Sequence, residues 1–566
     1  MQQNRNKNFL VAVFLFLVCF VTYSNALPNA FLMDDYPIII DNRAIKDPHF
    51  LQIAPFLKSD TEYNSADHVY WRPVTHLLNL FSFLLFNKDP FGYHLLNLLL
   101  VYACGVVLYE LLNSLFNRWQ LALLTSLLFC VHPINGVLVN YITTTGYSVL
   151  VLAVILGLRY SLAAQEGGKA AAYFLSLSWF SIALLCHEIA VVFPLYLSCV
   201  LFFLKNYSFR KICVVNMPFI LILIVYAIFR SAYVGFNSGT LAHIPHFHMS
   251  LSSYTATFSN LMFFYVRNLI FFDKIVLIWA SPIIKSSLFF WNIALGGLVI
   301  LCLVMMHLYG KRNEKTLAFS WFLVGLLPVG LACFSRPNLG FIIETHWMFF
   351  ASIGFFLFTA SFLLNIRRSA APFSLLSILI VLPLMASYIL SSRQYNKLWS
   401  NEMKYCRYML SLSPGMELPL WWLAYAHLRA HHYAEAKVLF EKTLRGTYRD
   451  WETYINLGVI EGALGNSASA VDYYYRALAV NPNAAEAYSN LAAHLINVGR
   501  LGKAEEYLQR AIRLDARLIE AKKNLATIYR QQGKVKEAIP LLEEILKIDP
   551  EDAYSLKTRR DLKGSL

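Results

Sequence analysis

The sequence predicts an all-α protein in which a polytopic membrane domain of about 11 transmembrane helices precedes a solenoid of helical repeats. Of the 566 residues, 57% are hydrophobic and 14% are charged, whereas a soluble domain has roughly 45–50% apolar and about 25% charged residues. Apolar runs follow one another up to about Ser391, and the chain from Arg393 onward is polar and rich in Ala, Glu, Lys and Arg. We therefore expect a membrane domain over 1–392, a linker over 393–418 and a repeat domain over 419–566.

The apolar runs are close to the length of about 20 residues that a helix needs to cross a bilayer. Two other apolar stretches, 74–86 and 260–280, are expected to be interfacial or re-entrant, because the first is short and the second contains three charged residues. The first run follows two basic residues and resembles a signal peptide, but an uncleaved span is favoured because many spans follow. The expected spans are about 9–27, 91–112, 119–133, 137–158, 173–187, 189–204, 213–230, 289–309, 317–335, 347–365 and 373–391.

The basic residues of the loops indicate the orientation in the membrane. With the N-terminus inside, every loop with clustered Lys and Arg falls on the inner side, as cytoplasmic loops do, and an odd number of crossings places the repeat domain outside. Unusual polar residues then collect in the outside loops. Each one alone fits an ordinary interfacial residue, but together they are what chemistry on the outer face needs. They are Asp34, Asp35, Arg72, His132, His187, Glu188, Arg336, Glu344 and His346.

Charge and cysteine content argue against a nucleic-acid-binding protein and against a protein built on disulfides or cysteine-bound metal. The net charge is +14, but the basic residues cluster at membrane loops rather than in one stripe, so nucleic-acid binding is not expected. The nine cysteines lie mostly inside apolar runs and show neither a CxxC pair nor a metal-like spacing, so we interpret them as small buried hydrophobic residues.

The strongest local signal of chemistry is the acidic pair Asp34-Asp35, directly after the first span. Ionised side chains beside a membrane are costly unless water, a cation or a substrate meets them, so they are candidates for a functional site. The alternative is that the pair only begins a solvated loop.

The C-terminal part repeats with a step of 34 residues, the length of a tetratricopeptide repeat. Each of the four units, over about 419–552, pairs two small residues 12 positions apart, which lets two helices pack closely. Such units bury their apolar faces only by stacking, and the resulting superhelix usually holds a protein or peptide on its concave face. The paired small residues are Ala424 and Ala436, Gly458 and Ala470, Ala492 and Ala504, and Ala526 and Ala538.

An ordered set of motifs before these repeats carries a family resemblance over nearly the whole chain. The set is Asp34-Asp35, then Trp71-Arg72-Pro73, the run from Pro90 to Leu99, His132-Pro133, His187-Glu188 and Ser352-Ile353-Gly354-Phe355. It resembles the transmembrane and tetratricopeptide-repeat O-mannosyltransferases and their bacterial relatives. These belong to the GT-C superfamily of glycosyltransferases that use polyprenyl-phosphate sugars.

The chain departs from the eukaryotic pattern at two positions. The eukaryotic members typically have Lys-Glu where this chain has His187-Glu188, and an Arg after the glutamate that corresponds to Glu344, where this chain has Thr345. These departures favour a bacterial relative. A bacterial chain is expected in the inner membrane with its repeats in the periplasm, and a eukaryotic chain would lie in the membrane of the endoplasmic reticulum with its repeats in the lumen. They leave the sugar open between mannose and another hexose.

The resemblance implies transfer of a sugar from a polyprenyl-phosphate donor to a hydroxyl of a protein acceptor, with inversion. It places the base in the first outside loop, so that one of Asp34 and Asp35 takes the hydroxyl proton and the other positions it or binds a divalent cation. The donor phosphate needs cations or hydrogen-bond donors, and guanidinium groups suit it best. The residues available for it are Arg72, His132, His187, Arg336 and His346, with Glu188 and Glu344 orienting them.

Three other interpretations remain. An O-antigen-ligase or oligosaccharyltransferase-type enzyme also can end in such repeats, but its catalytic residues lie in a large late loop, whereas the long outside loops here are 28–90 and 231–288. A non-catalytic scaffold needs only one span to anchor its repeats, so the many spans expected here argue against it. A transporter would have charged residues near mid-membrane and broken spans in matched halves, and the sequence shows neither feature clearly.

Overall fold

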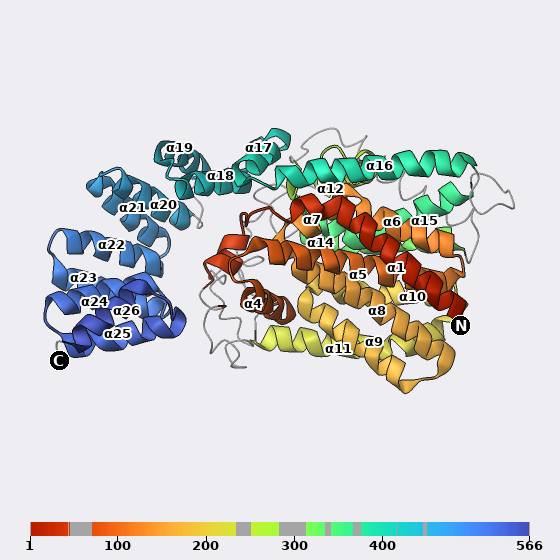
Figure 1. Ribbon diagram of the computed structural model, residues 1–566, viewed down its shortest axis with the longest axis horizontal. Helices are drawn as coiled ribbons and strands as arrows, with labels where there is room; N and C mark the ends of the chain where they lie inside the picture. The colour runs from red at the N-terminus through yellow and green to blue at the C-terminus, as the bar shows by residue number, and fades with distance from the viewer. Residues whose placement is uncertain are drawn as a thin grey trace. The chain divides into compact units, whose positions relative to one another are not determined.

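A computed structural model describes the chain over residues 2–42, 45, 71–233, 251–281, 313–333, 341–365, 375–414, 416–444 and 450–564. The described chain is helical almost throughout, as the sequence predicts (Figure 1). It forms two compact units, one comprising Met1–Ile40 and Leu57–Ser413 and the other centred on Pro414–Leu566. We call them the membrane unit and the repeat unit.

The membrane unit is a bundle of mostly apolar helices with one small antiparallel strand pair, β1 (Ile278–Ser281) and β2 (Phe341–Glu344), in which Ile278 lies opposite Glu344. Its helices are α1 (Gln2–Tyr23), α4 (Pro73–Phe86), α5 (Pro90–Phe116), α6 (Trp119–Val131), α7 (Val137–Asn140), α8 (Thr145–Gly167), α9 (Ala170–Cys186), α10 (Phe193–Phe203), α11 (Phe209–Tyr233), α12 (Leu251–Phe271), α14 (Glu314–Cys333), α15 (Phe349–Leu364), α16 (Leu375–Leu398) and α17 (Glu402–Leu412).

Six helical segments in the described part of the chain are long and apolar enough to cross a membrane. A seventh crossing results if Trp119–Val131 and Pro133–Asn140, bent by 55°, form one broken span. Three further apolar helices, Pro73–Phe86, Ala170–Cys186 and Glu188–Phe203, are shorter, and the expected span 289–309 lies outside the described residues. The six segments are Asn6–Ala26, Pro90–Phe116, Ile142–Gly167, Phe209–Ala232, Thr345–Leu364 and Ile378–Leu398.

One expected span begins later than the sequence indicated. We expected a helix over 137–158, but α7 ends at Asn140 and α8 starts only at Thr145, with a 3-10 helix Ile142–Thr144 between them. The residues Ile142 to Thr145 are all β-branched, which lowers helix propensity because the side chains are restricted against the preceding turn.

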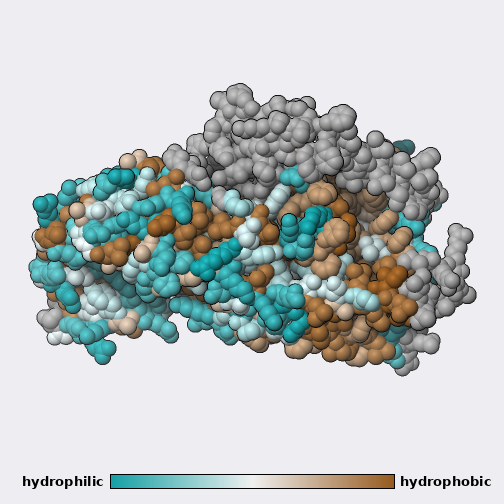
Figure 2. All heavy atoms as spheres, turned by 90° about the horizontal axis from the view of Figure 1, so that it is seen from above, coloured by the Kyte–Doolittle hydropathy of each residue, from teal (hydrophilic) through white to brown (hydrophobic). Residues whose placement is uncertain are grey.

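Close helix contacts depend on small residues. The α14–α15 pair approaches so closely that a Cβ on Gly325 would lie 2.5 Å from the backbone N of Ala351, and one on Gly354 would lie 2.3 Å from the carbonyl O of Ala318. Membrane helices commonly pack in this way, because lipid offers no hydrophobic drive for association. On the face drawn in Figure 2, brown apolar residues gather over the membrane unit, whereas teal hydrophilic residues are spread through the repeat unit.

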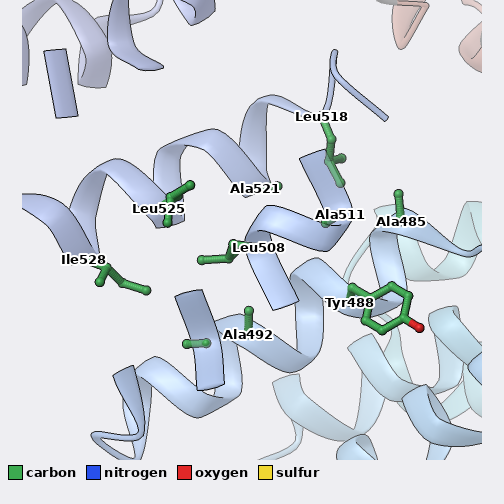
Figure 3. Packing of buried hydrophobic residues seen from close by; sticks show 10 residues of the cluster. Ala485, Tyr488, Ala492, Leu508, Ala511, Leu518, Ala521, Leu525 and Ile528 are labelled. Carbon is green, nitrogen blue, oxygen red and sulfur yellow. The ribbon is translucent and has the colours of Figure 1, made fainter. Parts of the chain in front are cut away.

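Over its described residues, the repeat unit contains four pairs of contacting helices and a final helix. The turns inside the pairs contain a residue with positive φ every 34 positions: His431, Gly465, Gly499 and Gly533. Small and aliphatic side chains fill the space between neighbouring helices, as Figure 3 shows for α22, α23 and α24. The four pairs expected from the sequence are therefore present. The helices are α18 (Glu417–Arg429), α19 (Tyr433–Thr443), α20 (Asp450–Ala463), α21 (Ser467–Val480), α22 (Ala485–Asn497), α23 (Leu501–Leu514), α24 (Ile519–Gln531), α25 (Val535–Ile548) and α26 (Ala553–Lys563).

Candidate active site

The acidic pair lies in the loop after α1, where Asp35 is fully buried. Its Oδ2 accepts a hydrogen bond from the backbone N–H of Leu32 at 2.9 Å, and its Oδ1 accepts one from the backbone N–H of Thr143 at 3.2 Å. Burial raises the pKa of the Asp35 carboxyl well above its usual value, although both hydrogen bonds act in the opposite direction. Asp35 therefore connects the loop to the segment that precedes α8.

Asp34 has a different environment. Its side chain is only partly buried, and its Oδ2 accepts a hydrogen bond from the phenolic O–H of Tyr141 at 2.8 Å. The residue before it, Met33, has a φ of 49°, a left-handed conformation that turns the chain sharply just ahead of the acidic pair. Asp34 is thus the more accessible carboxylate of the two.

Arg72 is the centre of a second polar set. Its Nε and Nη2 donate to the two carboxylate oxygens of Glu188 at 3.1 and 3.0 Å, the two-point geometry that a guanidinium group favours. Arg230, in α11, approaches the same carboxylate, with its Nη1 4.0 Å from Oε2. Burial alone would raise the pKa of Glu188, but the charge of Arg72, together with that of Arg230, holds it well below the usual value. Two guanidinium groups therefore share one ionised carboxylate.

His187 adds a neutral imidazole to this set. Its Nδ1 accepts a hydrogen bond from the backbone N–H of Ile189 at 3.1 Å, so a neutral ring carries its proton on Nε2, which lies 2.5 Å from the hydroxyl oxygen of Tyr147. Burial, and secondly the charge of Arg72, lowers the pKa of His187 to about 3. The ring is accordingly a hydrogen-bonding group at neutral pH, not a cation.

His346 and Glu344 complete the set from the end of β2. Nε2 of His346 lies 3.0 Å from Oε2 of Glu344, and the imidazole packs edge-on against the Tyr147 ring, with centroids 4.3 Å apart. His346 is buried, and its Nδ1 has no hydrogen-bond partner within the described residues. A buried polar atom without a hydrogen-bond partner needs an explanation, and one explanation is that it binds a ligand.

The two polar sets meet at the short stretch 141–147. Tyr141 donates to Asp34, Thr143 donates to Asp35, and Tyr147 contacts His187. At Gly146 in the same stretch, a Cβ would lie 2.3 Å from Oγ1 of Thr75, so only glycine lets this end of α8 approach α4, which begins directly after Arg72. The interruption between α7 and α8 thus connects the acidic loop with the second polar set. We call this set the Arg72 cluster; it comprises Arg72, His187, Glu188, Arg230, Glu344 and His346.

One predicted donor-binding residue, His132, is not part of this arrangement. His132 is fully buried and uses both ring nitrogens: Nδ1 accepts from the backbone N–H of Ile134, and Nε2 lies 3.1 Å from the carbonyl oxygen of Leu269. It has no nitrogen left for a phosphate in this conformation. Arg336 lies outside the described residues.

Sequence reasoning missed Tyr141, Tyr147 and Arg230. The β-branched run between the two tyrosines, followed by a glycine, was a usable signal, because such residues rarely continue a helix inside an apolar run. Arg230 had a weaker signal as a charged residue at the end of an apolar helix. Within the described part of the chain, no group of three or more His, Cys, Asp or Glu residues is placed to hold a metal ion.

The chain is similar to several curated protein O-mannosyl-transferases. Tmtc3 of Drosophila melanogaster is 30% identical over 152 residues, which are 23% of this chain and 16% of the relative. TMTC3 of Homo sapiens is 32% identical over 118 residues (20% and 12%), and F38B6.6 of Caenorhabditis elegans is 26% identical over 147 residues (25% and 21%). The matched segments therefore span between 12% and 21% of these relatives.

Models of the tetratricopeptide repeat match residues 423–485 and 483–551. Among solved structures, the chain resembles YrrB, described as a TPR protein with an unusual peptide-binding site, at 22% identity and a TM-score of 0.24 over 32% of this chain and 91% of that one. A thermophilic TPR protein of Thermus thermophilus matches at 20% identity and a TM-score of 0.26, over 32% and 94%. The chain thus has homologues among the curated protein O-mannosyl-transferases and carries tetratricopeptide repeats in its C-terminal part.

Proposed function

We propose that the chain is a GT-C-type membrane glycosyltransferase that moves mannose or another hexose from a polyprenyl-phosphate donor to a hydroxyl group of a protein acceptor. The observation that carries the proposal is the meeting of the acidic pair and the Arg72 cluster at residues 141–147. It brings a carboxylate suited to proton removal and a cationic group suited to a phosphate to one short stretch of chain. The names of the similar curated proteins support the same reaction.

In this proposal Asp34 is the base. It is partly exposed, and Tyr141 fixes its carboxylate by a hydrogen bond. Asp34 takes the proton from the acceptor hydroxyl, the hydroxyl oxygen bonds to the anomeric carbon from the opposite side, and the bond to the phosphate oxygen breaks. The lipid phosphate leaves with that electron pair, and the configuration of the sugar is inverted. Asp35, buried and bonded to two backbone N–H groups, holds the loop in place.

The Arg72 cluster is the proposed donor-phosphate site. Guanidinium groups stabilise the charge that develops on a leaving phosphate, and Arg230 adds a second one beside Arg72. His346 offers a buried Nδ1 without a partner in the described chain, while Glu188 and Glu344 orient the cations and the imidazole. His132 falls out of the proposed site because its nitrogens are occupied.

The proposed site faces the periplasm or the lumen, and the repeats lie on that side and bind the protein acceptor. The clustering of Lys and Arg in the loops that this orientation assigns to the inner side supports it. A divalent cation could be held only through Asp34, whose partly exposed carboxylate is an oxygen ligand of the kind that Mg²⁺ and Ca²⁺ prefer, because both oxygens of Asp35 accept backbone hydrogen bonds.

The test uses Asp34→Asn and Asp35→Asn in cells that lack the native copy, with glycan on extracytoplasmic proteins as the readout. Asp34→Asn should reduce transfer about 100-fold or more, the usual effect of losing a general base, at a normal level of protein in the membrane. Asp35→Asn should reduce the amount of folded protein. Full transfer by both variants would reject the proposal and favour a ligase or a scaffold.

A further inference from the structure

The segment from the end of α16 to the start of α17 packs against the loop that carries the acidic pair. Asn396 is fully buried, and its side chain donates to the Thr22 carbonyl at 3.0 Å and to Oδ1 of Asn25 at 2.8 Å. Its own Oδ1 accepts from Asn140 at 2.7 Å, and its backbone carbonyl accepts from Asn29 at 3.1 Å. A satisfied buried network of this kind fixes one arrangement of its members.

A buried aromatic residue of the same segment supports the partner of Asp34. Trp399 is fully buried, and its ring centroid lies 5.7 Å from that of Tyr141, the residue that donates to Asp34. Trp399 also stacks on Tyr405 at 4.1 Å. A buried aromatic cluster thus packs against the ring of the tyrosine that donates to Asp34.

Glu402 reaches the acidic loop directly. It is only 8% exposed, and its Oε1 accepts a hydrogen bond from the backbone N–H of Met33 at 2.9 Å, a contact across 369 residues. Glu402 is not required to cap its own helix, because Asn401 accepts from the N–H of Lys404 at 2.9 Å as the N-cap of α17. Its carboxylate instead accepts the hydrogen bond from Met33, the residue directly before Asp34. Met33 has a positive φ, a backbone conformation that is unfavourable for residues other than glycine.

We propose that Glu402 is a positioning residue that holds the Met33 peptide in its left-handed turn and thereby directs Asp34 toward the acceptor hydroxyl. The role in catalysis rests on the proposed function, in which Asp34 is the base. The effect of Glu402 on the conformation of the loop does not rest on the proposed function, since it depends only on the hydrogen bond to Met33. The segment that precedes the repeats thus belongs to the catalytic apparatus.

The experiment compares Glu402→Ala and Glu402→Gln with wild type in the full-length chain in detergent, with Asn401→Ala as the matched control. Hydrogen exchange is measured for the peptide that spans residues 30–38. Glu402→Ala removes the acceptor, so this peptide should exchange about tenfold or more faster, as amides do when a local hydrogen bond opens. Glu402→Gln keeps an acceptor oxygen and should stay close to wild type. Asn401→Ala weakens α17 without touching Met33 and should leave the peptide unchanged.

The second arm measures transfer. Glu402→Ala should lower kcat about tenfold or more with little change in the donor KM, because an interaction that only aligns the base acts on the chemical step, and Glu402→Gln should restore most of the rate. Unchanged exchange in Glu402→Ala, or equal exchange in Asn401→Ala and Glu402→Ala, would overturn the proposal. If wild type transfers no sugar, the proposed function fails, while the exchange measurement still decides whether Glu402 positions the loop.

Discussion

Two adjacent aspartates have different environments because of contacts that their sequence does not contain. The sequence identified the pair and its place beside the membrane, but Asp34 and Asp35 are equivalent in any local pattern. Their difference comes from Tyr141 and Thr143, more than 100 residues away. In the same way, Arg72 and Glu188 were found as candidates, whereas their two-point contact across 116 positions was not. Residue types were predictable at this scale, and partners were not.

The buried carboxyl of Asp35 should make stability depend on pH. Because burial raises its pKa, the folded chain binds the proton more tightly than the unfolded chain does. This contribution is complete below the ordinary pKa of about 3.9 and is lost as the pH rises toward the folded value. The apparent Tm of wild type should therefore fall relative to that of Asp35→Asn as the pH increases from about 4. Parallel Tm profiles of the two proteins in detergent would contradict this, and Asp89→Asn, at the exposed N-cap of α5, serves as the control.

The Arg72 cluster should require a guanidinium group and not only a positive charge. Arg72→Lys keeps the charge but loses the two-point contact with Glu188, so we expect kcat/KM for the donor to fall about tenfold or more. Initial rates at several donor concentrations would measure the change. Arg118→Lys is the matched control, because Arg118 pairs with Glu314 by a single Nη1 contact at 2.7 Å, away from the proposed site. Equal loss in both variants would indicate a general effect of arginine on the fold.

At the scale of elements, apolar runs predicted helices correctly, but six helical segments in the described part of the chain are long and apolar enough to cross a membrane, whereas about 11 spans were expected over the whole chain. The six candidate spans and the four repeat pairs follow from a hydrophobic length of about 20 residues and from the 34-residue step of small residues. The break at Tyr141 to Thr144 was missed, because apolar composition continues through it and only the β-branched run marks it. Helix interruptions of this kind depend on local propensity and on tertiary partners such as Asp34, which a hydropathy pattern does not include.

The repeat turns allow a test of one element. His431 stands at a positive φ where the other three repeats have glycine. A left-handed conformation costs a residue with a side chain roughly 1–2 kcal/mol, and the greater chain entropy that glycine loses on folding offsets part of this. His431→Gly should therefore stabilise the first repeat by about 0.5–1 kcal/mol, and Gly499→His should have the opposite sign. Urea titration followed by tryptophan fluorescence would show whether the signs differ, with Trp421 and Trp422 lying in the repeat of His431.

At the scale of the whole molecule, truncations that end at different residues should distinguish catalysis from acceptor binding. The membrane unit extends to Ser413 and includes α17, whereas Pro414 begins the repeat unit. Deletion of 414–566 keeps Asn396, Trp399 and Glu402, so the truncated chain should still glycosylate a short hydroxyl-containing peptide. It should glycosylate a full-length protein acceptor about tenfold or more slowly, because the repeats no longer raise the local concentration of acceptor near the site.

Deletion of 394–566 removes the segment that contacts the acidic loop, and it should abolish transfer to both substrates even if the chain still reaches the membrane. The comparison is informative because the two truncations differ by only the short segment 394–413. An unchanged rate of the shorter deletion on the full-length acceptor would remove the repeats from acceptor binding. Equal rates of both truncations on the peptide would show that α17 and the residues before it do not position the base, and that the end of the catalytic unit lies within α16.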